Sequence, residues 1–294
     1  MASTARPTAL NGPHMKTGAF AGSRLSTRFA PVLAGAVLAA GLFGAAAPAA
    51  ADGISLAAFY RVQLSGVAIG KAGLNADVGG AAYHVKGWGK LSGMTAMFSN
   101  AIGAAASDGA VEAGSLTPAR YDFDLKDDSE ASRVAIGFAA GRVDKVTITP
   151  PEPERPDRVP LGDQHRLGAF DPMSALIVRH APGADGATIC NRTVPVFEGL
   201  QRFDLPLVYK KTVKVRSEDG AFKGLAHVCR ARYQPLAGHR PQRWVIRYMM
   251  ENKDLEVWLV PIGASGYSVP WRISIGTTLG PAVIEAESFT YSGA

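Results

Sequence analysis

Short segments that alternate apolar and polar residues, and that end at glycine, make up most of the chain after Asp52. Tyr60–Leu64 alternates in this way, Ser65-Gly66 supplies a turn, and the apolar segment Val67–Ile69 follows. Successive side chains of a strand point to opposite faces of a sheet, so this pattern predicts a β-hairpin. The repetition of strand and turn limits the fold more than any other feature of the sequence.

Further strands are expected along the whole chain. They are predicted at Ala82–Trp88, Tyr121–Leu125, Arg133–Phe138, Val143–Thr149, Thr193–Phe197, Leu200–Leu207, Val208–Val215, Ala221–Tyr233, Arg243–Met249, Leu255–Val260, Trp271–Thr277 and Ala282–Tyr291. Many short strands at roughly ten-residue spacing indicate an antiparallel sandwich or barrel, and not an alternation of strands with helices. The class predicted from these patterns is all-β and mostly antiparallel.

Two segments break the strand pattern and predict short helices. Leu91–Phe98 carries apolar residues at helical spacing. The stronger candidate is Asp171–Arg179, in which Asp171 can cap the first turn and Pro172 suits the first helical position. Apolar side chains of that helix are expected to face the sheet: Met173, Leu176 and Ile177.

A proline-rich segment at 150–160 separates the two halves of the strand pattern. Proline lacks a backbone N–H group, so the segment cannot be a central strand, and we expect an exposed, stiff connection. It could divide two domains. Residues 52–294 are short enough for one large β domain, and a single domain is the favoured organisation.

Residues 1–51 have the three parts of a secretory signal peptide. Basic residues precede an uncharged apolar run at 32–43, and Ala49-Ala50-Ala51 follows it. The predicted cleavage lies between Ala51 and Asp52, and translation could start at Met1 or at Met15. A membrane anchor is the alternative, but the apolar run is shorter than the ~20 residues that span a bilayer. General secretion is therefore expected.

The charge of the chain depends on this cleavage. Four of its 31 basic residues and none of its 25 acidic residues precede residue 52, which leaves a mature chain close to +2. A nucleic-acid partner is therefore not expected. No later segment approaches the length of a transmembrane helix, so no membrane span is expected after cleavage.

The two cysteines, Cys190 and Cys229, both remain in the mature chain. In an oxidising compartment an even pair is usually bridged, so a disulfide is predicted. A metal pair and a redox site are the alternatives. The wide separation, without a C-x-x-C motif or a nearby histidine doublet, disfavours both, and no metal is expected.

Motifs that would indicate catalysis are weak or absent in the sequence. Gly66–Lys71 resembles a phosphate-binding loop but is one residue too short, and it is interpreted as a hairpin. Gly87–Gly93 misses the dinucleotide fingerprint by one residue and is interpreted as a turn. No G-x-S-x-G or H-E-x-x-H motif occurs. Asp171 and Ser174 could form a reactive pair, although helix capping explains both. Scattered histidines are interpreted as structural: His84, His165, His180, His227 and His239. No catalytic residue and no cofactor are predicted.

Six short motifs follow one another along the mature chain. They are Val67–Ala72, Leu116–Tyr121, Asp171–Ala175, Val196–Phe203 after Cys190, Cys229–Tyr233 and Ala237–His239. Their order resembles an exported proteobacterial family, domain of unknown function 3108. The resemblance implies a periplasmic β-rich protein of open-barrel type, without an established activity. The resemblance implies a turn within Val196–Phe203 that is richer in acidic residues, glycine and arginine. This chain has Glu198, Leu200 and Gln201 there and departs from that pattern.

Together these observations predict a curved or incompletely closed β-barrel with one or two short helices, exported to the periplasm. The favoured function is a non-catalytic cell-envelope factor that binds a lipid-like or glycan ligand, because small open barrels often enclose a lined cavity. An envelope hydrolase and a purely structural assembly protein are the competing possibilities. An apolar interior would favour a lipid, a cleft joining a serine or carboxylate with a histidine would favour an enzyme, and a filled interior would favour a scaffold.

Overall fold

The computed structural model describes residues 53–92, 101–127 and 130–293, and these residues form one antiparallel sheet. Its strands are β1 Ile54–Leu64, β2 Val67–Gly79, β3 Ala82–Leu91, β4 Ile102–Glu112, β5 Ser115–Lys126, β6 Ala131–Ala139, β7 Arg142–Thr149, β8 Val178–Arg179, β9 Arg192–Phe197, β10 Arg202–Arg216, β11 Lys223–Ala231, β12 Gln234–Ala237, β13 Leu255–Pro261, β14 Tyr267–Thr277 and β15 Gly280–Ser292. The main path runs β12-β10-β11-β13-β14-β15-β1-β2-β3-β4-β5-β6-β7. Its two ends, β12 and β7, are not paired with each other in the described part of the chain, so the barrel is not closed.

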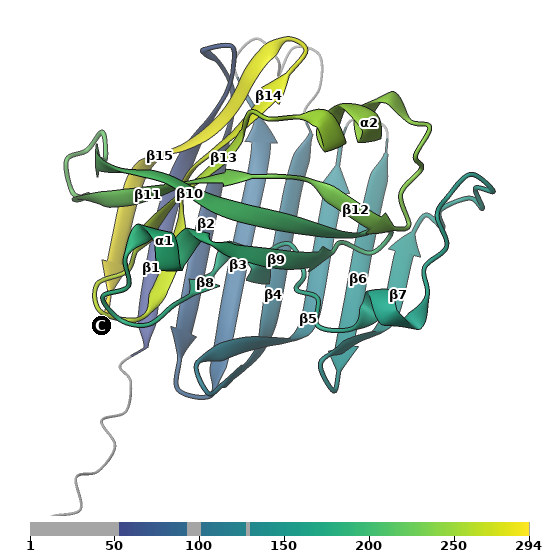
Figure 1. Ribbon diagram of the computed structural model, residues 1–294, viewed down its shortest axis with the longest axis horizontal. Coiled ribbons are helices and arrows are strands. Elements are labelled where there is room, and N and C mark those ends of the chain that lie inside the picture. Colours follow the sequence, from purple (N-terminus) through teal and green to yellow (C-terminus); the bar gives the residue numbers. More distant parts are fainter. Residues whose placement is uncertain (1–52, 93–100, 128–129, 294) are drawn as a thin grey trace, which may run out of the picture. The chain divides into compact units, whose positions relative to one another are not determined.

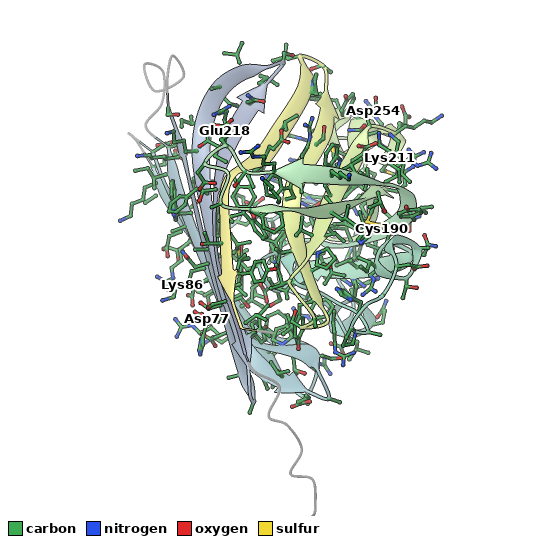
Figure 2. The ribbon with its side chains drawn as sticks, turned by 90° about the vertical axis from the view of Figure 1, so that its left-hand side faces the viewer. Asp77, Lys86, Cys190, Lys211, Glu218 and Asp254 are labelled. Carbon is green, nitrogen blue, oxygen red and sulfur yellow. A yellow bond between two sulfur atoms is a disulfide. The ribbon has the colours of Figure 1, made fainter. Side chains whose placement is uncertain are left out.

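The first seven strands form a broad wall, and later strands cross its inner face. In Figure 1 the wall stands behind β9 to β12, which run across it at a steep angle. Strands β13, β14 and β15 curl round from the crossing strands to β1. Figure 2 shows the wall edge-on, with Asp77 and Lys86 on its outer side, away from the second layer. The incompletely closed barrel predicted from the sequence is confirmed.

Three hairpins of the wall turn on two residues with positive φ. These are Ser65-Gly66, Ala113-Gly114 and Ala140-Gly141. Positive φ at both central residues defines the turn whose twist matches that of the flanking strands. The predicted hairpins at residues 65–66 and 140–141 are therefore confirmed, and the phosphate-loop-like motif at 66–71 is the start of a hairpin strand.

Two hydrophobic clusters pack in the interior. The larger one joins the wall to β14 and β15, and in it Phe222 lies 5.4 Å from Trp271 and 4.8 Å from Phe289 between ring centroids. The smaller one lies between α1 (Gly186–Cys190), β10, β11 and β13. Sulfur atoms of Cys190 and Cys229 lie there 2.01 Å apart, a geometry compatible with the predicted disulfide.

The helix predicted at Asp171–Arg179 is much shorter than expected. Only the 3-10 turn η3 (Ser174–Leu176) forms, and Val178–Arg179 pairs with β14 as strand β8. The capping signal starts one turn, but β-branched Ile177 and Val178 then favour extended backbone. Met173 and Ile177 are buried, as predicted. The second predicted helix, Leu91–Phe98, falls largely outside the described residues, as do residues 1–51 with the expected signal peptide.

Several predictions of strands and turns are wrong in detail. The segment predicted as strand Arg243–Met249 is helix α2 (Trp244–Glu251), because its apolar residues also recur at helical spacing. The strands predicted at 200–207 and 208–215 merge into β10. The turn predicted at Gly87–Gly93 is wrong for residues 87–91, which lie inside β3, and Gly93 falls outside the described residues. Strand β4, rich in alanine and glycine, is absent from the predicted strands.

The proline-rich connection has no regular structure. Residues 151–160 contain no helix or strand and are mostly exposed, and a 3-10 turn, η2 (Asp163–Arg166), follows them.

Within the described ranges, no helix combines the length and the apolar character needed to cross a bilayer.

Candidate functional site

Two apolar cavities lie on either side of η3. The first, the sheet cavity, has a volume of about 320 Å³ and is bordered by the inner face of β1 to β5 together with η3, β14 and β15. The second, the crossing cavity, has a volume of about 280 Å³ and is bordered by β9, β10, β11, β13, β14, α2 and η3. Leu176, Pro270 and Ile273 border both, so the two cavities adjoin.

Small residues on the inner face of the wall create the sheet cavity. Strand pairing aligns Ala72, Gly89 and Gly103 in one row across β2, β3 and β4. The next row holds Gly87 and Ala105. Side chains of neighbouring strands in one row normally fill the space above the sheet. Here most of that space stays empty: a Cβ atom added at Gly89 would meet only the Lys71 carbonyl oxygen, at 3.9 Å.

Hydrocarbon side chains dominate the lining of the crossing cavity. They come from facing strands and include Val194, Val196, Leu205, Leu207, Val257, Leu259 and Ile275. Glu256 is the one charged residue among the described residues that line it. Its Oε1 accepts a hydrogen bond from Lys210 Nζ at 2.5 Å, and its Oε2 accepts one from Trp258 Nε1 at 3.3 Å. Burial raises the pKa of Glu256, but these hydrogen bonds and the lysine charges outweigh burial and lower that pKa.

The cysteine pair lies behind the lining of the crossing cavity. Cys190 and Cys229 pack in one cluster with Leu207, Leu255 and Leu259, which line the cavity. The pair joins α1 to β11 across a sequence separation of 39 residues. The predicted disulfide there would hold the crossing strands in place behind the cavity lining.

A buried hydrogen-bond network fixes η3 between the two cavities. Asp171 is fully buried, and its Oδ1 accepts hydrogen bonds from the backbone N–H groups of Met173 and Ser174, both at 2.9 Å. Its Oδ2 accepts hydrogen bonds from the hydroxyls of Ser174 at 2.5 Å and Ser107 at 2.8 Å. The Tyr83 hydroxyl lies 2.7 Å from the Ser174 hydroxyl. Strands β3 and β4 therefore position the turn that carries Leu176.

The electrostatics of this network disfavour catalysis by Ser174. Burial raises the pKa of Asp171 and raises the pKa of the Tyr83 hydroxyl to about 12. Ser174 is 1% exposed, and its side-chain hydrogen-bond partners among the described residues are Asp171, Ser107 and Tyr83, with no histidine. An activated serine nucleophile needs an adjacent general base and access for its substrate. The arrangement suits a structural anchor.

One histidine does meet a serine. His180 Nε2 lies 2.8 Å from Ser268 Oγ, and His180 Nδ1 lies 2.8 Å from the Ala181 carbonyl oxygen. Ser268 is completely buried, and neither residue lines the sheet cavity or the crossing cavity. The pair connects the start of β14 to the segment after β8 and offers no access to a substrate.

The remaining predicted histidines lie apart from one another. His84 is exposed on β3, and His165 Nδ1 accepts a hydrogen bond from the Gly162 N–H group at 3.0 Å. His227 Nδ1 lies 2.9 Å from Thr212 Oγ1, and burial lowers the pKa of His227. Burial also lowers the pKa of His239, whose Nδ1 has no hydrogen-bond partner. In the part of the chain that the structure describes, no three His, Cys, Asp or Glu residues are grouped to hold a metal ion.

The residues that form the cavities are absent from the sites predicted on the sequence. Their signal is present as glycine at alternate positions, Gly87 and Gly89, within a segment that otherwise reads as strand. Glycine inside a strand marks a place where the sheet lacks a side chain and another group can approach closely. The fold and the cavities define a half-open antiparallel β-barrel with an apolar interior.

The comparisons with known proteins agree with the resemblance noted in the sequence. A family model described as "Protein of unknown function (DUF3108)" matches residues 59–287, and the chain belongs to this family. A solved structure titled as a β-barrel-like protein of domain of unknown function DUF1849 from Brucella abortus is similar to this chain, with a TM-score of 0.49 and 12% identity. The match covers 82% of this chain and 99% of that chain. No curated protein matches the chain.

Proposed function

We propose that this protein binds the hydrocarbon part of a lipid-like molecule in its two adjoining cavities and does not transform it chemically. The observation that carries the proposal is the apolar lining: about 600 Å³ of space in total, with Glu256 as its one charged residue among the described lining residues. Ligand sites in proteins commonly have volumes of about 300–1,000 Å³ and mainly apolar walls.

A glycan is a weaker candidate because its hydroxyl groups need many hydrogen-bond partners. The two tyrosine hydroxyls at the cavities already have partners within the protein. Tyr60 donates its hydroxyl proton to the Pro270 carbonyl oxygen at 2.8 Å, and Tyr233 donates to Gln201 Oε1 at 3.1 Å. A buried sugar hydroxyl without a partner would cost binding free energy.

A hydrolase and a structural scaffold fit the interior less well than a binding protein does. A hydrolase would need a reachable nucleophile, whereas Ser174 and Ser268 are both buried and hydrogen-bonded. A scaffold has no need of unfilled space, because an empty apolar cavity costs stability in proportion to its size. Binding of an apolar ligand offsets that cost.

Export completes the proposal. The basic, apolar and small-residue parts of residues 1–51 support secretion, and the cysteine pair suits an oxidising compartment. The proposed site of action is therefore the periplasm, where the protein would serve the cell envelope. N-terminal sequencing of the product should find a start at or near Asp52. A full-length chain retained in the membrane would contradict export.

Fluorescence of methyl cis-parinarate, a neutral apolar probe that becomes emissive in apolar surroundings, tests the cavities directly. The wild-type protein should bind it, and Gly89→Ile, which places a side chain in the sheet cavity, should weaken binding by at least about tenfold, or ~1.4 kcal/mol. Gly137→Ile is the matched control, because an added Cβ there also meets little, only Lys145 at 3.9 Å, and Gly137 does not line either cavity.

The outcome of this test separates the two cavities. Ala231→Leu fills the crossing cavity in the same way, because Ala231 is buried and lines it. Loss of binding in one variant alone would identify the cavity that holds the probe. Absence of binding to the folded wild-type protein would refute the proposed function. The proposal would also fail if Gly89→Ile, Ala231→Leu and the control Gly137→Ile all bound the probe as tightly as the wild-type protein does.

A further inference from the structure

A third cavity adjoins the crossing cavity and has a different chemistry. Its volume is about 260 Å³, and Ala175, Val178 and Val194 line both cavities. The remaining described residues around it include Ser115, Thr193 and two arginines, Arg179 of β8 and Arg192 of β9. We call it the arginine cavity. No aspartate or glutamate is among its described lining residues.

Arg192 is held in place with part of its hydrogen-bonding capacity unused. Its Nη1 donates to the Arg179 carbonyl oxygen at 2.5 Å, and its Nη2 donates to the Thr188 carbonyl oxygen at 3.0 Å. Its Nε is buried and has no hydrogen-bond partner. A guanidinium group has five N–H donors in a rigid plane, and these two bonds occupy one donor on each Nη atom, so an incoming anion could accept from the remaining Nη hydrogens.

Arg179, an exposed residue of β8, adds a second positive charge to the lining of the same cavity. Its guanidinium packs against the turn at Gly114, where an added Cβ would lie 2.3 Å from Arg179 Nε. That turn is itself fixed, because the Tyr267 hydroxyl donates to the Gly114 carbonyl oxygen at 2.9 Å. Neither Arg179 nor Arg192 forms an ion pair with a described residue, since the salt bridges of this part of the chain involve other arginines.

Partial burial of the Arg192 charge costs free energy when no anion is nearby. This burial lowers the pKa of Arg192, and no neighbouring acidic group raises that pKa again. A partly buried cation is stabilised by a hydrogen-bonded counter-charge, and bidentate contacts from arginine suit a carboxylate or a phosphate group.

We propose that the arginine cavity binds the anionic head of the same lipid-like ligand, through Arg192 and Arg179, while the hydrocarbon tail occupies the crossing cavity and extends into the adjoining sheet cavity. This inference rests on the proposed function and narrows its ligand to anionic amphiphiles. The shared walls at Ala175, Val178 and Val194 place the charged and apolar parts of the site next to each other, as one amphiphile requires. The head is a carboxylate, as in a fatty acid, or a phosphate monoester, as in a lysophosphatidic acid.

The test compares cis-parinaric acid with its methyl ester on the purified protein that starts at or near Asp52. The wild-type protein should bind the acid more tightly, and Arg179→Gln should weaken binding of the acid by about tenfold or more while leaving the ester unchanged, since hydrogen bonds to charged groups are strong. Arg179 is the main variant because its side chain holds no described backbone group. Arg192→Gln should act in the same direction, and Arg192→Lys should restore only part of the preference, because lysine lacks the planar fork.

The control is Arg230→Gln, which removes an exposed arginine of β11 that lines none of the three cavities. Displacement of cis-parinaric acid by oleic acid or by oleoyl lysophosphatidic acid identifies the head group. The competitor that displaces the probe more strongly carries the preferred head, and displacement by either one supports an anionic site. Equal affinity for acid and ester would overturn the inference while leaving the proposed function intact. Failure of both probes to bind would overturn the two together.

Discussion

Gly89 of β3 lies opposite Gly103 of β4 in the sheet, and Ala72 of β2 completes their row. The inner face of the wall therefore lacks large side chains at the place where η3 lies over it. In most sheets such a row would hold valine or isoleucine and would close the interior. The absence of these side chains makes room for the sheet cavity and thus for the proposed ligand.

Replacing Gly89 or Gly109 of the wall by alanine should change the free energy of unfolding in opposite directions. Gly89→Ala should raise the free energy of unfolding by about 0.5–1 kcal/mol, because alanine reduces the backbone entropy lost on folding. Gly109→Ala in β4 should lower it by about 1–3 kcal/mol, because its Cβ would lie 2.2 Å from the Thr117 carbonyl oxygen. Urea unfolding of both variants checks the prediction, which fails if the two changes have the same sign.

The strand pattern can be predicted from the sequence because its signals are local. Alternation over a few residues and turns such as Ser65-Gly66 depend on neighbouring positions, and they recover the hairpins of the wall. Strand β4 escapes prediction since its alanines and glycines have low strand propensity. Pairing with β3 and β5 on both sides makes it a strand, and pairing partners cannot be identified from a local pattern.

The candidate site cannot be predicted for a related reason. The row Ala72, Gly89 and Gly103 exists only when three strands take their observed register. The arginine cavity likewise joins the start of β5 with β8 and β9, segments that lie far apart in the sequence. The local pattern identifies Asp171 as a cap, but its contact with Ser107 of β4 depends on the fold. The sequence contains the residues of these sites, and the tertiary structure brings them together.

Burial of Asp171 predicts a specific dependence of stability on pH. Its folded-state pKa is raised above the ordinary value of 3.8, with burial as the largest cause. The folded protein therefore holds this proton more tightly than the unfolded chain does. Below pH ~4 both states are protonated; as pH rises through the raised pKa, the contribution of this group to stability is lost.

Asp171→Asn should remove that loss, because the amide oxygen can still accept from the Met173 and Ser174 N–H groups. The stability difference between the variant and the wild-type protein should shift in favour of the variant from about pH 4 upward, as measured by urea unfolding at several pH values. Asp171→Ala, which loses the hydrogen bonds to both N–H groups and both hydroxyls, should destabilise the fold by at least ~2 kcal/mol at neutral pH. A pH-independent difference for Asp171→Asn would contradict the assigned burial effect.

Removal of the cysteine pair should loosen the crossing strands. A link across 39 residues is expected to stabilise the fold by about 4 kcal/mol on the chain-entropy model. Cys190→Ala with Cys229→Ala should lower the free energy of unfolding by that order, as measured by urea unfolding without reductant. Peptide mapping of the native protein under non-reducing conditions should recover one linked peptide pair. Two thiols that alkylate in the native protein would contradict the bridge.

Leu176 and Ile189 offer a last comparison, because both are aliphatic side chains but only Leu176 borders the cavities. The cost of truncating a buried side chain to alanine, about 2–5 kcal/mol, rises with the volume left empty. Ile189 is fully enclosed in the smaller cluster, so Ile189→Ala should cost about 4 kcal/mol. Leu176 is half-buried and borders a cavity on two sides, so Leu176→Ala should cost about 2 kcal/mol or less.

Leu176→Ala also removes side-chain volume between the two cavities. Methyl cis-parinarate should therefore bind this variant at least as tightly as it binds the wild-type protein. A large loss of probe binding in folded Leu176→Ala would show that Leu176 acts as a contact for the ligand and not as a partition.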